Sequence, residues 1–242
     1  MDLAALSEGL KSGLRLESPP VALCTMDEPP AGVALEGLAP SACTFWRRAE
    51  KGVFFVDADG HYGCPIGAMV MGFPLPDPVA EDLAQIVTAM GSCGYMADGE
   101  AQQIPTLSHS RRGILYGPLD EFPVEPEVVL IWLSPLQAML YAESVGSVRW
   151  VGSDSTSLFG RPACAALAAA RRDDGAALSL GCTGMRAFTE IGDDRLLAAV
   201  SGTRLQTLAR ELSETVRANV TMRGAYEQRK ARLTQEIASA GR

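Results

Sequence analysis

Six consecutive large apolar residues, Val128–Leu133, give this sequence its strongest local pattern. An uninterrupted apolar run of strand length predicts a β-strand that is buried on both faces of a sheet. The run is far shorter than the ~20 apolar residues that cross a bilayer. The sequence therefore predicts a sheet with covered faces and no membrane span.

Helical and strand patterns are mixed along the rest of the chain. Leu3, Leu6, Leu10 and Leu14 recur at helical spacing, which predicts an amphipathic helix at the start. Apolar spacing, caps and Pro or Gly breaks predict further helices over 41–52, 65–71, 77–90, from 134 onward and over 163–172, and strands over 21–24, 53–56, 113–117, 177–180 and 196–200. Because strands and helices do not alternate regularly, we expect an α+β fold, with a mixed sheet and flanking helices.

The end of the sequence differs in character from the rest. Thr203-Arg204-Leu205-Gln206 reads as a capping box that opens a long, mostly polar helix to about Ala240. We expect residues 1–202 to form one α+β domain. Residues 203–242 are expected to form a helical extension that packs on this domain or mediates a homodimer.

The charge balance limits the classes of partner. The chain has 21 Lys and Arg against 29 Asp and Glu, a formal net charge of −8. Nucleic acids and anionic membrane surfaces require cationic footprints, so neither is an expected partner. The first residues lack the basic and apolar regions of a secretory signal, which predicts a cytoplasmic protein.

Six cysteines occur, and no two of them form a Cys-x-x-Cys pair. Disulfide frameworks belong to small exported scaffolds, and the usual zinc-ribbon spacing is missing. The remaining interpretations are inert buried thiols, a reactive thiolate, or a metal site gathered from distant segments. Inert burial is the default for any single cysteine, so the surroundings of each one must decide.

Four cysteines have informative surroundings. Cys64 follows His61 by three residues and precedes Pro65 at a helix start, where backbone N–H groups favour a thiolate. Cys43 and Cys164 also lie beside predicted helix starts. Cys182 lies in a glycine turn, between Gly181 and Gly184, that lets the backbone approach a ligand closely, and Arg186 just beyond it could neutralise an anionic group. Cys24, in a strand, and Cys93, at a helix end, fit inert thiols better.

Several longer stretches together resemble one known family. They are Ser41-Ala42-Cys43-x-Phe45-Trp46, His61-x-x-Cys64-Pro65-Ile66-Gly67-Ala68, Phe73-x-Leu75-Pro76, Tyr116-Gly117-Pro118-Leu119, Gly160-Arg161-Pro162-x-Cys164 and Ser179-Leu180-Gly181-Cys182-x-Gly184-x-Arg186. The chain resembles domain of unknown function family 169, over nearly its whole length to about Gly202. The resemblance implies that Cys43, His61, Cys64, Cys164 and Cys182 are marked positions, and it implies no activity.

The leading hypothesis is a thiolate-held iron–sulfur cluster with Cys43, Cys64 and Cys182 as ligands. A fourth iron would be open to a small molecule or to sulfur chemistry, or would be filled by His61 or Cys164. Zinc is compatible with the same residues. Two other classes remain: a metal-free enzyme that uses Cys64 or Cys182 with His61 as base on a small molecule, and a non-catalytic ligand-binding sensor.

Overall fold

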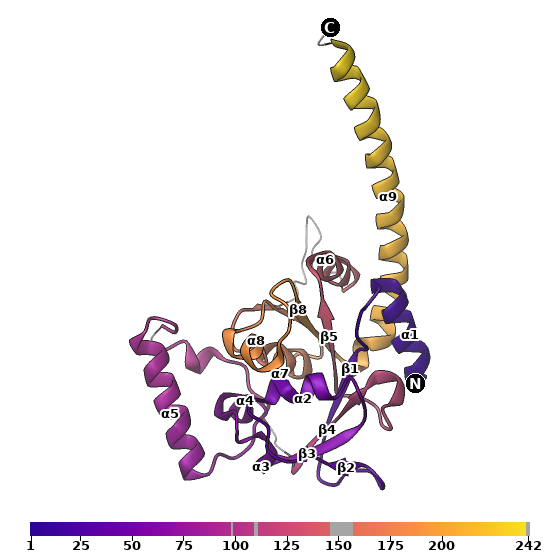
Figure 1. The fold of residues 1–242 in the computed structure, drawn as a ribbon. Coiled ribbons are helices and arrows are strands. Elements are labelled where there is room, and N and C mark those ends of the chain that lie inside the picture. Colours follow the sequence, from indigo (N-terminus) through magenta and orange to yellow (C-terminus); the bar gives the residue numbers. More distant parts are fainter. Residues whose placement is uncertain (98, 109–110, 146–156, 241–242) are drawn as a thin grey trace.

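The computed structural model describes residues 1–97, 99–108, 111–145 and 157–240. These residues form an α+β fold built on a single mixed sheet with helices on both faces (Figure 1). The strands are β1 (Val21–Met26), β2 (Ala34–Leu35), β3 (Phe54–Asp57), β4 (Gly113–Pro118), β5 (Val128–Leu133), β6 (Ser157–Phe159), β7 (Ala176–Ser179) and β8 (Leu196–Ser201).

The sheet order is β2-β3-β4-β1-β5-β8-β7-β6. The central strands pair antiparallel, whereas β2 with β3 and β6 with β7 form parallel pairs at the two ends. All six residues of β5 are buried, so the prediction from the apolar run 128–133 is confirmed. β5 lies between β1 and β8, and its position in the middle of the sheet explains why both of its faces are apolar.

The helices divide into two layers, and each layer covers one core. The helices are α1 (Leu3–Leu14), α2 (Ala42–Arg48), α3 (Ala58–His61), α4 (Pro65–Val70), α5 (Asp77–Ser92), α6 (Pro135–Ser144), α7 (Ala165–Arg172), α8 (Thr183–Thr189) and α9 (Leu205–Ala240). Helices α2, α4, α7 and α8 pack on one face of the sheet, and α1, α6 and the first part of α9 pack on the other. Alternate residues of β5 belong to opposite cores: Leu130 and Trp132 face α2 and α7, whereas Ile131 faces α6 and α9.

Two helices stand out because they bury little of themselves. None of the 16 residues of α5 is buried. In α9, which has 36 residues, the buried ones are Leu205, Leu208 and Leu212, and the rest of the helix extends away from the sheet (Figure 1). Both helices were predicted from their spacing, but spacing alone did not show how little of each packs on the core.

Local predictions were confirmed in part. The Ser134 capping box forms, because Ser134 and Gln137 bond each other's backbone N–H. The capping box predicted at Thr203 does not form, since the Thr203 hydroxyl donates to Asp174 and a 3₁₀ turn, η3 (Gly202–Arg204), precedes α9. Two further 3₁₀ turns, η1 (Ala101–Gln103) and η2 (Leu119–Glu121), and the elements α3, α8, β2 and β6 were not predicted.

Candidate functional site: a cavity lined by four cysteines

Four of the six cysteines line one cavity of about 320 Å³. Cys43 lies in the first turn of α2, and Cys64, Cys164 and Cys182 are the N-cap residues of α4, α7 and α8. These are the four cysteines that the sequence singled out. The remaining two, Cys24 in β1 and Cys93 at the end of α5, do not line this cavity.

Cys64 is held by the turn that begins α4. Pro65 occupies the first helical position, and the Gly67 N–H donates to the Cys64 sulfur at 3.3 Å. A Cβ at position 67 would stand 2.8 Å from the Cβ of Ala42 and 3.1 Å from that sulfur. Glycine at this position therefore allows α2 and α4 to approach each other beside the sulfur.

Cys182 has a matching arrangement at the start of α8. The Met185 N–H donates to its sulfur at 3.3 Å. Gly181 has a φ of +84°, and a Cβ there would lie 2.7 Å from Met185. Gly184 borders the cavity and has open space where a side chain would begin. Backbone N–H groups thus contact both half-exposed sulfurs, an arrangement that stabilises negative charge on sulfur.

Cys43 and Cys164 form the deeper part of the cavity. Their exposed fractions are 7% and 4%. Burial raises the pKa of both thiols well above the ordinary value, and nearby cysteines, including Cys64 and Cys182, raise it further. Without a positively charged partner these two thiols are neutral near pH 7. A bound metal centre would supply the charge that the thiolate forms require.

The other walls of the cavity are apolar. α5 stands to the left of α2, α4 and α8 in Figure 1, and it contributes Leu83, Ile86, Val87 and Met90 to the cavity lining. Polar side chains at the edge come from the loop after α5 and from the segment that precedes α7: the ring of Tyr95, the carboxylate of Glu100 and the guanidinium of Arg161. Sequence reasoning missed these three as site residues, because no local pattern links them.

His61 is not among the residues that line the cavity. Its exposed fraction is 0%, and it packs between the rings of Phe45 and Phe73. Nδ1 donates to the Asp57 carbonyl at 2.7 Å, so Nε2 is the acceptor of the Tyr116 hydroxyl at 2.9 Å. Burial lowers the pKa of His61 to about 4. With both ring nitrogens engaged, His61 is part of the core and is placed neither to ligate metal nor to act as base to Cys64.

The role of Arg186 is also structural. Its guanidinium donates to the backbone carbonyls of Gly192, Leu180 and Arg195 at 2.8, 2.8 and 3.1 Å. These bonds close the loop that follows α8, and Arg186 does not line the cavity. The arginine at the cavity is instead Arg161.

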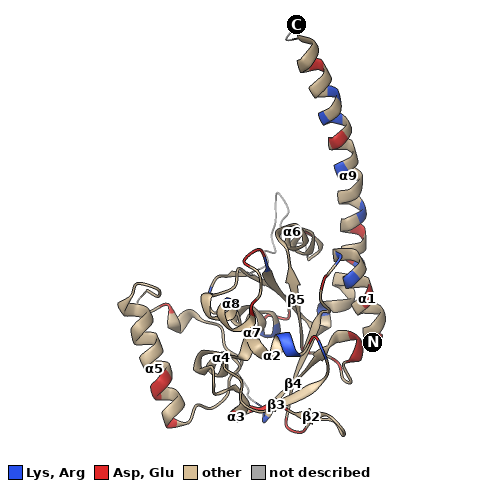
Figure 2. Ribbon diagram, in the orientation of Figure 1, with Lys and Arg blue, Asp and Glu red and all other residues tan. Residues whose placement is uncertain are grey.

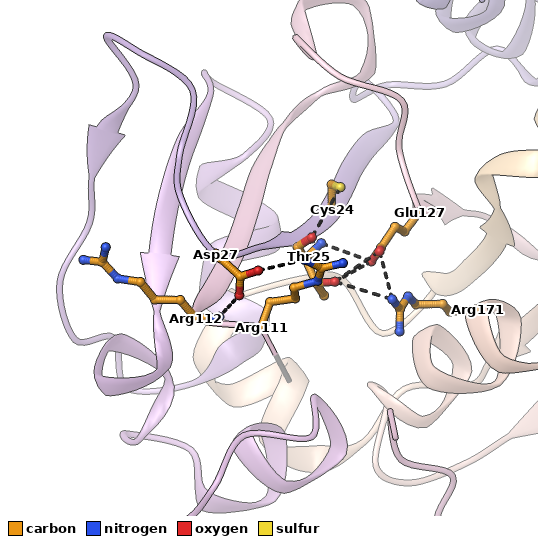
Figure 3. Close-up of polar contacts among 7 residues, drawn as sticks. All are labelled: Cys24, Thr25, Asp27, Arg111, Arg112, Glu127 and Arg171. Carbon is orange, nitrogen blue, oxygen red and sulfur yellow. Dashed lines mark hydrogen bonds and ion pairs between the residues drawn. The ribbon is translucent and has the colours of Figure 1, made fainter. Parts of the chain in front are cut away.

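A second polar cluster lies at the end of β1 (Figure 3), and none of its residues lines the cavity. The carboxylate of Glu127 accepts the N–H and the hydroxyl of Thr25 at 3.0 and 2.9 Å, and it pairs with Arg171 at 2.8 Å. Nearby, Arg111 pairs with Asp27 at 2.7 Å. Burial and the Glu127 carboxylate raise the pKa of Cys24 to about 11, so this thiol is unreactive. The cluster joins β1, β5 and α7, and its role is structural.

The cysteine sulfurs are not arranged around a single ion. Within the described parts of the chain, no group of three or more His, Cys, Asp or Glu side chains could hold a metal ion. A tetrahedral zinc site with bonds of about 2.3 Å would bring its sulfurs to within ~3.8 Å of one another. The second histidine, His109, falls outside the described residues.

Comparison with known proteins places the chain in one group. A family model described as "Uncharacterised ArCR" matches residues 9–211, which includes all four cavity cysteines. No curated protein and no solved structure matches the chain. Across the described residues, no helix is both long and apolar enough to cross a membrane.

Proposed function

This chain belongs to the DUF169 family, and we propose that it holds an iron–sulfur cluster in the cysteine-lined cavity and uses it on a small molecule. The observation that carries the proposal is the convergence of Cys43, Cys64, Cys164 and Cys182, from four separate elements, on one cavity. Structural burial alone does not require four cysteines at one cavity, whereas Cys thiolates are the usual ligands of iron–sulfur clusters.

A four-iron cluster and a single zinc ion require different spacings of the ligand sulfurs. A four-iron cluster brings its own sulfide and binds each protein thiolate at a different iron, so its ligands stand further apart than those of one ion. This agrees with the lack of a preformed single-ion site among the described residues. The N–H groups of Gly67 and Met185 would continue to donate to the sulfurs of Cys64 and Cys182 in the bound state.

The proposed ligands are Cys43, Cys64 and Cys182, and Cys164 is the fourth cysteine at the same cavity. When bound, the cluster would supply electron transfer, or an iron open to the cavity as a Lewis acid. The chain itself would exclude water through α5 and the apolar walls. The metal-free alternative, with His61 as base, has less support because both ring nitrogens of His61 have partners in the core.

The test is anaerobic purification followed by visible absorbance and by iron, zinc and sulfide analysis. We expect a brown protein with stoichiometric iron and sulfide that Cys64→Ala loses. Cys24→Ala and Cys93→Ala are matched controls, since neither residue lines the cavity, and both should retain the cluster. A cluster that survives in Cys164→Ala would indicate three protein ligands. A colourless protein with zinc, or one without metal under anaerobic conditions, would contradict the proposal.

A further inference from the structure

α5 acts as a wall of the cavity rather than as part of a core. Its apolar residues Leu83, Ile86, Val87 and Met90 share one face at helical spacing, and that face lines the cavity. All four side chains are only half-buried, and no residue of α5 is fully buried. A ligand that fills the cavity would bury this half-exposed apolar face, and that burial is energetically favourable.

The cavity has the size and surface of a small-molecule site. Its volume of about 320 Å³ is at the small end of ligand pockets, which run from about 300 to 1,000 Å³. Besides α5 and the cysteines, its walls include Ile66, Met69, Ile104 and Phe188. An occupant must therefore present a mostly apolar body.

Arg161 is the one cationic side chain among the described residues that line the cavity. Its guanidinium lies over the Tyr95 ring, 4.4 Å from the centroid, which fixes the plane of the group. Its ion pair with Glu100 is long, with N–O distances of 3.4 and 3.5 Å. Glu100 is held more closely by the backbone N–H of Ala97, at 2.9 Å. Arg161 is therefore oriented and only loosely paired.

We propose that this cavity binds a small organic acid whose apolar body lies between α5 and the cysteines and whose anionic group pairs with Arg161. The proposal deepens the proposed function by naming the class of its substrate, and it rests on that function only for the chemistry that follows binding. A planar carboxylate can accept two parallel N–H bonds from the guanidinium, which the long contact with Glu100 does not exploit. The carboxylates of Glu100 and of the exposed Asp82 at the edge oppose a second negative charge in the ligand.

The test uses three probes that share an eight-carbon chain and differ in charge: octanoate, 1-octanol and octylammonium. Calorimetric titration of the purified protein should give the tightest binding for octanoate. Arg161→Gln should weaken octanoate about tenfold, by loss of a charge-assisted hydrogen bond, and leave octanol unchanged. Arg172→Gln, which removes an exposed arginine at the end of α7, should change neither.

A second pair of variants places the probe in the cavity. Ile86→Glu introduces a charge on the cavity face of α5 and should abolish binding of both octanoate and octanol. Ala84→Glu, on the exposed face of the same helix, should not. Another apolar groove lies between α1, α6 and α9, with Leu136, Met139 and Val220 in its lining. Binding that is lost in Val220→Glu and kept in Ile86→Glu would overturn the proposal.

Other results would also overturn it: octylammonium binding best, equal binding of all three probes, or no binding of octanoate. Each titration is run on protein with measured iron and sulfide content and again after removal of metal. Octanoate binding to protein that holds no cluster even when purified anaerobically would contradict the proposed function alone, whereas a cluster without octanoate binding would contradict this inference alone. Melting temperatures of the variants verify that each one folds.

Discussion

The imidazole of His61 is kept neutral inside the core. Burial lowers its pKa to about 4, whereas an exposed histidine titrates near 6.5. Between these two values the unfolded chain binds a proton that the folded chain does not bind. The contribution of His61 to the free energy of unfolding is therefore fully present above about pH 6.5, and it falls as the pH drops toward 4.

We expect the free energy of unfolding to fall by about 2 kcal/mol between pH 7.5 and pH 5 on account of His61. Urea denaturation at the two pH values measures it, with His61→Gln as the comparison because glutamine does not titrate. The variant should be less stable at pH 7.5 and should lose less stability on acidification. An equal loss in both proteins would show that other groups cause the acid sensitivity.

The positions of single residues were predicted unevenly. Cys43, Cys64, Cys164 and Cys182 stood out because each has a local signal, a helix start or a glycine turn, that the sequence displays directly. His61 had the same kind of local signal from its spacing to Cys64, yet its ring turns toward Tyr116, a residue on a distant strand. Local spacing does not reveal which way a side chain points when its partner is far away in sequence.

At the scale of elements, the ion pair between Arg171 and Glu127 fastens the end of α7 to the sheet. Both side chains are 28% exposed, and the carboxylate also bonds Thr25 on β1 (Figure 3). Arg171→Met leaves a half-buried carboxylate without its cation and should lower the free energy of unfolding by about 1–3 kcal/mol. Chemical denaturation measures the loss. Arg172→Met, which removes an exposed pair with Asp173, should cost less than about 1 kcal/mol.

Elements with a clear period were predictable, and those defined by their neighbours were not. The helix over 77–90 was predicted from its apolar spacing and its Asp-Pro start, and it forms as α5. The spacing alone did not show that the apolar face of this helix borders a cavity. β6 has three residues and owes its existence to pairing with β7, so no local pattern could have revealed it.

At the scale of the whole molecule, α9 joins two regions of different character. Its first turns complete the core beneath α1 and α6, whereas its outer part is exposed and rich in Lys and Arg (Figure 2). Removal of residues 223–242 should therefore change the free energy of unfolding by less than about 1 kcal/mol. Removal from residue 203 onward should unfold the chain, because it deletes Leu205, Leu208 and Leu212 from the core.

The same truncation addresses the prediction of a homodimer. Light scattering of the full chain and of residues 1–222 gives the mass of each. If the outer part of α9 holds two copies together, the full chain is a dimer and the shortened chain a monomer. Equal masses would show that this segment does not mediate association.

The sheet order has a consequence for how the chain comes into being on the ribosome. Cys43 and Cys64 are translated early, whereas β8, which lies between β5 and β7 in the sheet, follows Cys182. A nascent chain that has exposed all four thiols still lacks the strand that joins the two halves of the sheet. The cavity therefore takes shape only after β8 has been made, and any group it receives must be delivered after that point.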